Sequence, residues 1–203
     1  LAGGKPLFMP NNLREASLYA YYSGKPSITL YNRPEKKSQY ELWGYEDSLQ
    51  GKDVLVVTKY PFYESRELKT NLQTVHYSTI LSFRSFYTNI SIEPLFVHQT
   101  SDSILATIVI NNHRNRRLIF ENSLNGGQTS VMYSLEKNGK IIHADSVQSL
   151  SPADSVASKG SIERIVAIPK KSITAGEYTL YFGLRHGFLP DAILSKGTVV
   201  SLH

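Results

Sequence analysis

The sequence predicts an α+β protein in two parts. We expect residues 1–72 to form a small, partial α/β unit with a short parallel sheet, and residues 73–203 to form an immunoglobulin-like antiparallel β-sandwich. Three observations lead to this prediction: a strand–helix–strand pattern near the start, the loss of helical periodicity after about residue 72, and short strands separated by turns in the rest of the chain.

The strand–helix–strand pattern opens with a short apolar strand at Pro6–Met9. Asn12 and Glu15 have the spacing of a helix N-terminus, where the Asn side chain accepts a hydrogen bond from a free backbone N–H and the Glu reaches back. Gly24 suits the left-handed residue after a helix, and Pro26 prevents the helix from continuing. One face of the predicted helix carries Leu13, Ala16, Ala20 and Tyr21.

Two strands are expected after this helix. Ser27–Tyr31 alternates and completes the strand–helix–strand unit, which is the start of a parallel sheet. Asp53–Thr58 contains a continuous apolar run, which is typical of a strand covered on both faces. We expect one or two helical turns at Phe62–Leu68.

The remainder of the chain is predicted to be all β-structure. Asn138 and Gly139 separate two strand-like segments and predict a hairpin, because the tight turn requires positive φ angles. Asn122–Gln128 and Gln148–Gly160 are predicted loops, read either as plain connections or as functional segments. The expected strands are Val75–Phe83, Phe86–Ile92, Ile104–Ile110, Leu118–Glu121, Val131–Glu136, Lys140–His143, Ile162–Ile168, Tyr178–Leu184 and Thr198–Leu202.

The chain is mildly basic, with a net charge of +5. The positive residues are scattered in short groups instead of forming one stripe, and we therefore expect no nucleic-acid partner. Arg114, Arg116 and Arg117 form one such group, which is either a solvated turn or a contact for an anionic lipid headgroup or phosphate.

Several classes of catalytic site are excluded by the sequence. The chain has no Cys, so it has no disulfide, iron–sulfur cluster, thiolate zinc site or Cys nucleophile. It also lacks a P-loop, a Gly-rich dinucleotide fingerprint, a nucleophile elbow and a pair of His residues with zinc-binding spacing. We therefore predict no catalytic residue, cofactor or metal in this chain. The predicted helix N-terminus after Met9 remains a candidate anion site.

A cluster of aromatic residues is the main candidate for recognition. Tyr40, Trp43 and Tyr45 lie close together in the sequence, beside Gln39. Aromatic faces with polar edges can stack against a sugar ring and orient it. The same side chains can instead pack onto the sheet, and both interpretations stay open. These four residues are therefore the candidates for a sugar or acceptor surface.

Three segments resemble a known family. In order, Asn12–Pro26, Asn32–Trp43 and Gly51–Thr58 resemble the soluble C-terminal region of bacterial dolichyl-phosphate-mannose-protein mannosyltransferase-like membrane glycosyltransferases. These enzymes are relatives of the aminoarabinose transferases that modify lipid A. The resemblance covers roughly residues 5–58, and the matching positions are Arg14, Tyr22, Gln39, Tyr40 and Trp43.

The resemblance implies a role without catalysis for this chain. Such enzymes use polyprenyl-phosphate sugar donors and carry their catalytic acidic residues in loops among the membrane helices. The chain starts with Leu1 and not with Met, and we expect it to be a fragment of a longer protein. The membrane domain of the same polypeptide is then its main partner, with lipid headgroups or a glycan acceptor as further partners.

The expected location is the periplasmic or extracytoplasmic face of a bacterial inner membrane. The expected function is that of a non-catalytic accessory domain of a polytopic glycosyltransferase. The alternative is a carbohydrate- or protein-binding β-sandwich module of a secreted or surface protein, because the β-rich part and the aromatic cluster fit that class equally.

Overall fold

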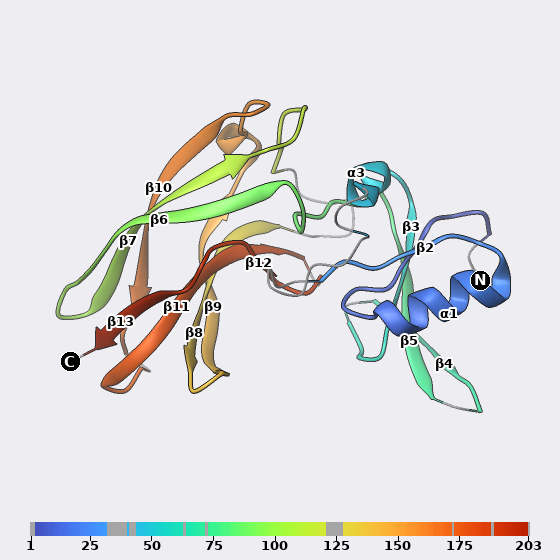
Figure 1. The fold of residues 1–203 in the computed structure, drawn as a ribbon, viewed down its shortest axis with the longest axis horizontal. Helices are drawn as coiled ribbons and strands as arrows, with labels where there is room; N and C mark the ends of the chain where they lie inside the picture. The colour runs from blue at the N-terminus through green and yellow to red at the C-terminus, as the bar shows by residue number, and fades with distance from the viewer. Residues whose placement is uncertain are drawn as a thin grey trace. The chain divides into compact units, whose positions relative to one another are not determined.

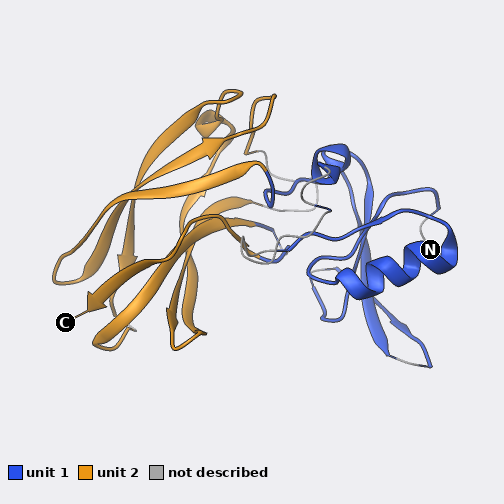
Figure 2. Cartoon of the chain, in the orientation of Figure 1, with its two compact units in different colours: residues 1–88, 122–127, 186–190 blue, residues 89–121, 128–185, 191–203 orange. Residues whose placement is uncertain are grey.

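The computed structural model describes residues 3–31, 40, 44–62, 64–71, 73–120, 128–171, 173–187 and 189–202. The chain is mostly β-structure and contains several sheets (Figure 1). It divides into two compact units, drawn in different colours in Figure 2. Unit 1 contains Leu1–Thr88 and His186–Pro190, and unit 2 contains Asn89–Glu121, Gln128–Arg185 and Asp191–His203.

Unit 1 is built on a five-stranded sheet with the order β2-β1-β3-β5-β4. β1 is parallel to both β2 and β3, whereas β5 is antiparallel to β3 and β4. The strands are β1 (Leu7–Phe8), β2 (Ser27–Ile28), β3 (Val54–Thr58), β4 (Arg66–Lys69) and β5 (Thr74–Ile80).

The predicted helix is present as α1 (Leu13–Ser23), between β1 and β2. Gly24 ends it in the left-handed conformation with φ 64°, as expected. The predicted Asn12 cap is different, because the Asn12 side chain makes no cap hydrogen bond. Instead, the backbone N–H of Asn12 donates to Oγ1 of Thr29 at 3.1 Å, which ties the start of α1 to the chain that follows β2.

The sheet of unit 1 is apolar on both faces. On one side Leu7, Met9 and Leu55 pack with Ala16 of α1. On the other side the Phe8 ring lies edge-on to Phe83, with ring centroids 5.3 Å apart. The expectation of a strand covered on both faces fits the buried first three residues of β3.

The segment after β3 differs from its predicted helical turns. β4 begins at Arg66 and pairs with β5 over four residues, so the last three residues of this segment are strand. The residues described before it contain a local turn, in which the Phe62 N–H donates to Oγ of Ser65 at 3.0 Å. A segment this short has too few residues for helical periodicity to compete with a long-range ladder.

Unit 2 contains two antiparallel sheets. The first has the order β10-β7-β6, and the second has the order β12-β11-β8-β9 with β13 also paired to β11. The strands are β6 (Ile90–Gln99), β7 (Ser103–Asn112), β8 (Thr129–Lys137), β9 (Lys140–Leu150), β10 (Ser161–Pro169), β11 (Gly176–His186), β12 (Ala192–Ile193) and β13 (Thr198–Leu202).

In each sheet of unit 2, one long strand buries about every second residue. In β7 the burial alternates along all ten residues, with the even-numbered side chains inside. β11 shows the same period, with Tyr178, Leu180, Phe182 and Leu184 buried. The strand predicted at Ile104–Ile110 is therefore confirmed.

The hairpin predicted at Asn138-Gly139 is also confirmed. It joins β8 to β9, and both turn residues have positive φ angles, 53° and 75°. β9 continues to Leu150, so the start of the predicted Gln148–Gly160 loop is strand, followed by the short 3-10 helix η2 (Pro152–Asp154). At Leu118 the predicted strand is only an isolated bridge to Val156.

The change from one unit to the other lies at Thr88–Asn89. The sequence places its boundary at residue 72, and β5, which follows that residue, pairs with β3 and β4 in unit 1. Within the described part of the chain, no helix is long and apolar enough to cross a membrane.

Candidate functional site: a tyrosine-lined cavity in unit 1

A cavity of about 590 Å³ lies in unit 1 where the chain enters β1 and β2. Tyrosines from three segments line it, namely Tyr19, Tyr40 and Tyr45. Lys5 and Lys25 line it as well and supply two ammonium groups. A concave surface with aromatic walls and a few polar groups is the usual form of a small-ligand site.

The packing of α1 on the sheet positions the residues that form one side of the cavity. Ala16 is fully buried against the sheet, and Tyr19, three residues later, packs partly against the same cluster. Oγ of Ser27 donates to the carbonyl oxygen of Ala16 at 2.5 Å, so β2 is fixed to the middle of α1. Lys25 lies between the helix end and β2, and its N–H donates to Oγ of Ser23 at 3.1 Å.

The opposite side comes from the short helix α3 (Tyr45–Leu49). Tyr45, its first residue, is 39% exposed, and its ring centroid lies 6.0 Å from that of Tyr40 at an interplanar angle of 48°. Leu49 is buried and also lines the cavity. Two tilted rings at this distance form an aromatic corner and not a closed stack.

α3 is held in place by a buried carboxylate. Glu46 is 0% exposed, and its two carboxylate oxygens accept hydrogen bonds from the backbone N–H groups of Tyr87 and Thr88, both at 2.7 Å. Oγ1 of Thr88 donates to the same side chain at 2.6 Å. Charge-assisted bonds of this kind are short and strong, so the helix that carries Tyr45 has a fixed position in unit 1.

The predicted sugar surface is only partly visible in this geometry. Tyr40 and Tyr45 both line the cavity, whereas Gln39 and Trp43 lie outside the described residues. Lys5, Tyr19 and Lys25 were not expected at the site. Lys5 and Lys25 are brought together by the parallel pairing of β1 with β2, and Tyr19 by the packing of α1 on the sheet.

The three arginines of the predicted lipid contact differ in their exposure to solvent. Arg114 is 4% exposed, so its guanidinium lies inside unit 2, whereas Arg116 and Arg117 are exposed. The turn is fixed by Asn112, whose side-chain amide donates to the carbonyl oxygen of Arg116 at 2.8 Å and accepts from the N–H of Arg114 at 3.0 Å. Only Arg116 and Arg117 have the exposure that a headgroup contact needs.

A smaller cavity of about 340 Å³ lies at the other ends of the parallel strands. It includes Asn12 at the start of α1 and Lys59 after β3, where the sequence suggested an anion site. The Lys59 ammonium lies 2.9 Å from the Glu15 carboxylate, and this hydrogen bond lowers the pKa of Glu15. The lysine charge is thus compensated within the protein, which makes this cavity the weaker candidate.

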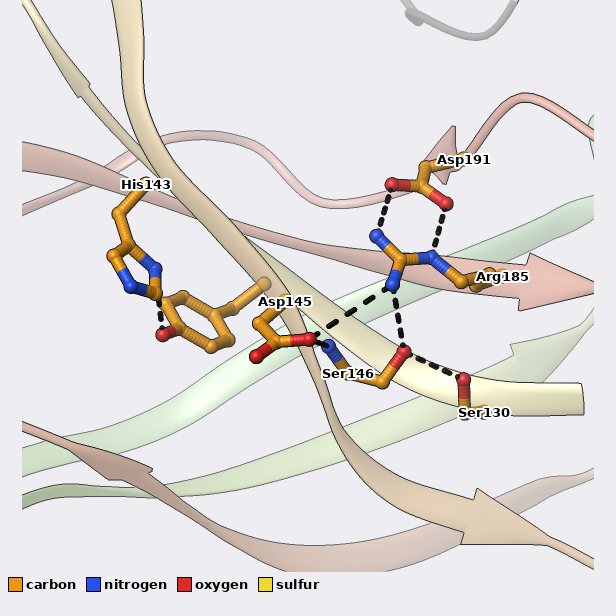
Figure 3. A network of polar contacts seen from close by, with 7 residues as sticks. Ser130, His143, Asp145, Ser146, Arg185 and Asp191 are labelled. Carbon is orange, nitrogen blue, oxygen red and sulfur yellow. Dashed lines mark hydrogen bonds and ion pairs between the residues drawn. The ribbon is translucent and has the colours of Figure 1, made fainter.

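Unit 2 contains a polar network on the sheet of β8, β9 and β11 (Figure 3). Nε and Nη2 of Arg185 donate to the two carboxylate oxygens of Asp191 at 2.7 and 2.8 Å. Nη1 of Arg185 donates to Oγ of Ser146, which also accepts from Oγ of Ser130 at 2.9 Å. Because the bidentate pair neutralises the guanidinium, this network fits a structural role.

His143, which is also labelled in Figure 3, pairs with Tyr133. The hydroxyl of Tyr133 lies 2.8 Å from Nδ1 of His143, and the two rings stack with centroids 5.5 Å apart. Burial, with a smaller contribution from the Asp145 carboxylate, raises the pKa of Tyr133 to about 12. The phenol therefore stays protonated at neutral pH and is a poor general base.

Metal ligands do not gather in the described part of the chain: no group of three or more His, Asp or Glu side chains there has the arrangement of a metal site. The described geometry offers the tyrosine-lined cavity as a ligand site. The Arg185 network instead connects the neighbouring strands β8, β9 and β11 of unit 2.

Known proteins show little similarity to this chain. No protein-family model matches the chain, and no match to a curated protein was found. Among solved structures, the chain is similar to a β-glucosidase from Kluyveromyces marxianus in complex with glucose, with 15% sequence identity and a TM-score of 0.35. That match covers 60% of this chain and 15% of the β-glucosidase chain, and a similarity this weak carries no argument.

Proposed function

We propose that this chain is an extracytoplasmic C-terminal accessory domain of a polytopic membrane glycosyltransferase that uses a polyprenyl-phosphate sugar donor. In this proposal unit 1 is a partial α/β unit and unit 2 is an immunoglobulin-like β-sandwich. Catalysis belongs to the membrane domain of the same polypeptide, and this chain helps to receive a sugar-bearing lipid or acceptor on the periplasmic side.

The tyrosine-lined cavity is the observation that supports this role best. A sugar ring has apolar C–H faces that suit the Tyr40 and Tyr45 corner, and hydroxyls that suit a polar rim. Lys5 and Lys25 provide positive charge for a phosphate attached to such a sugar. Together, these groups fit a phosphorylated or lipid-linked saccharide better than a purely apolar ligand.

The same cavity supports a second candidate function. A carbohydrate-binding module of a secreted or surface protein needs only the ligand site, and the described lining residues all belong to unit 1. The two proposals differ in what the complete reading frame encodes. A hydropathy scan that finds many spanning segments before Leu1 would favour the glycosyltransferase, and a lone signal peptide would favour the module.

Replacing the tyrosine at the start of α3 is expected to weaken saccharide binding. Tyr45→Ala should lower the affinity for a polyprenyl-phosphate sugar roughly tenfold, because burying an aromatic face contributes about 1–2 kcal/mol. Isothermal titration with a short-chain polyprenyl-phosphate sugar in detergent micelles measures this, with the matching polyprenyl phosphate as the sugar-free reference.

Tyr60→Ala is the matched control, because Tyr60 is a 79% exposed tyrosine of unit 1 that does not line the larger cavity. It should bind as the unchanged chain does. Equal affinities of Tyr45→Ala and the unchanged chain would contradict the proposed site. A lower thermal midpoint of Tyr45→Ala with unchanged affinity would show that Tyr45 serves packing alone.

A further inference from the structure

The outward side of α1 carries a line of aromatic and cationic side chains. Tyr21 and Tyr22 are 81% and 80% exposed, Leu18 is 42% exposed, and Arg14 is exposed one turn earlier. At about 100° per residue, these positions lie about 120° to 160° around the helix from Ala16, the side chain that α1 buries against the sheet. Tyr21 therefore does not share the buried face on which the sequence predicts it. We call Arg14, Leu18, Tyr21, Tyr22 and the adjoining Lys25 the outer stripe of α1.

The outer stripe has a net positive charge. Arg14 stands at one end, and the exposed Lys25 follows the left-handed Gly24 at the other. The nearest acidic side chain on α1 is Glu15, whose carboxylate is paired with Lys59 at 2.9 Å. The stripe therefore presents two cations without an acidic residue of its own, and it is complementary to an anionic surface.

The aromatic part of the outer stripe has the character of an interfacial anchor. The Tyr21 and Tyr22 rings contact each other edge-on, with centroids 5.1 Å apart, so they form one paired unit. A tyrosine ring with a polar hydroxyl at its tip is favoured at the headgroup level of a bilayer, where one end is apolar and the other is hydrated. Leu18 adds an aliphatic side chain between them and Arg14.

We propose that the outer stripe of α1 lies against an anionic lipid surface. The helix lies in the plane of the interface, the two tyrosine rings reach the headgroup region, and Arg14 and Lys25 contact lipid phosphates. Lys25 also lines the tyrosine-lined cavity. The contact would therefore place the headgroup of a lipid-linked sugar near the residues that bind it.

This inference rests on the proposed function for the presence of a membrane, but its test is separate from the saccharide titration. The unchanged chain is mixed with sucrose-loaded vesicles of phosphatidylcholine alone or of phosphatidylcholine with phosphatidylglycerol, and the pelleted fraction is measured. Two double variants are compared: Tyr21→Ser with Tyr22→Ser, and Arg14→Gln with Lys25→Gln. The control is Tyr60→Ser, which alters an equally exposed tyrosine.

The chain is expected to partition into the anionic vesicles more strongly than into the neutral ones, and added salt should reduce this binding. Each lost cation should weaken binding to anionic vesicles roughly fivefold. The tyrosine variant should lose binding to a similar extent while keeping the thermal midpoint of the unchanged chain, and Tyr60→Ser should bind normally.

Two results would overturn the proposal. One is that the unchanged chain does not bind anionic vesicles, or that both double variants bind them as strongly as the unchanged chain does. The other is no vesicle binding together with a self-associated chain, seen by sedimentation, that the tyrosine variant makes monomeric; the stripe would then be a protein interface. Loss of saccharide affinity in Tyr45→Ala with normal vesicle binding would leave this inference intact, so the two proposals can fail independently.

Discussion

Glu46→Ala is expected to lower the free energy of unfolding of unit 1 by about 3–5 kcal/mol, because it removes a buried carboxylate and leaves three hydrogen-bond donors without their acceptor. The N–H groups of Tyr87 and Thr88 and the hydroxyl of Thr88 all donate to this carboxylate. Glu46 is 0% exposed, so water cannot replace the lost oxygens without opening the structure.

Urea unfolding followed by circular dichroism measures the loss, and hydrogen exchange at the Tyr87 and Thr88 amides reports it locally. Glu67→Ala is the matched control, because its carboxylate is half exposed and only forms a surface ion pair with Lys69 at 3.3 Å. That variant should stay within about 0.5 kcal/mol of the unchanged chain. An equally small effect for Glu46→Ala would contradict the anchoring of α3.

His186 is expected to make the stability of unit 1 depend on pH. The side chain is 6% exposed and lies edge-on to Phe86, with ring centroids 5.4 Å apart. Burial, with a smaller contribution from the positive charge of Arg84, lowers the pKa of His186 to about 4. The unfolded chain, in which this pKa is near the ordinary histidine value of 6.5, therefore binds the proton more readily than the folded chain.

The sign of the effect follows from this difference. The free energy of unfolding has its full value, as far as His186 is concerned, above about pH 6.5. It decreases progressively as the pH falls toward about 4, in total by roughly 3 kcal/mol. Urea unfolding at a series of pH values should show this slope, and His186→Gln should remove its share.

His98→Gln is the control for this series, because His98 is exposed on β6. It should leave the slope in place. A direct NMR titration of the His186 ring gives an independent check. A midpoint near the ordinary histidine value would contradict the buried, neutral state described here.

The elements that could be predicted from the sequence are those with strong local signals. α1 combines an apolar face with a Gly24 end, and the β8–β9 hairpin has the Asn138-Gly139 turn. The helical turns expected at Phe62–Leu68 lacked such a signal, and β4 forms there instead. There the outcome depends on the ladder with β5, a long-range contact that has no local signature.

The candidate site shows the same division. Tyr40 and Tyr45 could be predicted because they are close in sequence, whereas Lys5 and Tyr19 reach the cavity only through the packing of β1, β2 and α1. For Arg114 the local sequence is misleading. Its charge suggested a surface role, but the turn held by Asn112 places it inside unit 2.

The most direct test of the proposed function is to map the ligand on the protein. Backbone NMR spectra of the isotope-labelled chain are recorded while a short-chain polyprenyl-phosphate sugar is added. If the tyrosine-lined cavity binds the sugar, shift changes are expected at Lys5, Tyr19, Lys25 and Tyr45, and little change around Arg185 and Asp191. Absence of saturable shifts, or shifts confined to unit 2, would contradict a sugar-binding role for the tyrosine-lined cavity.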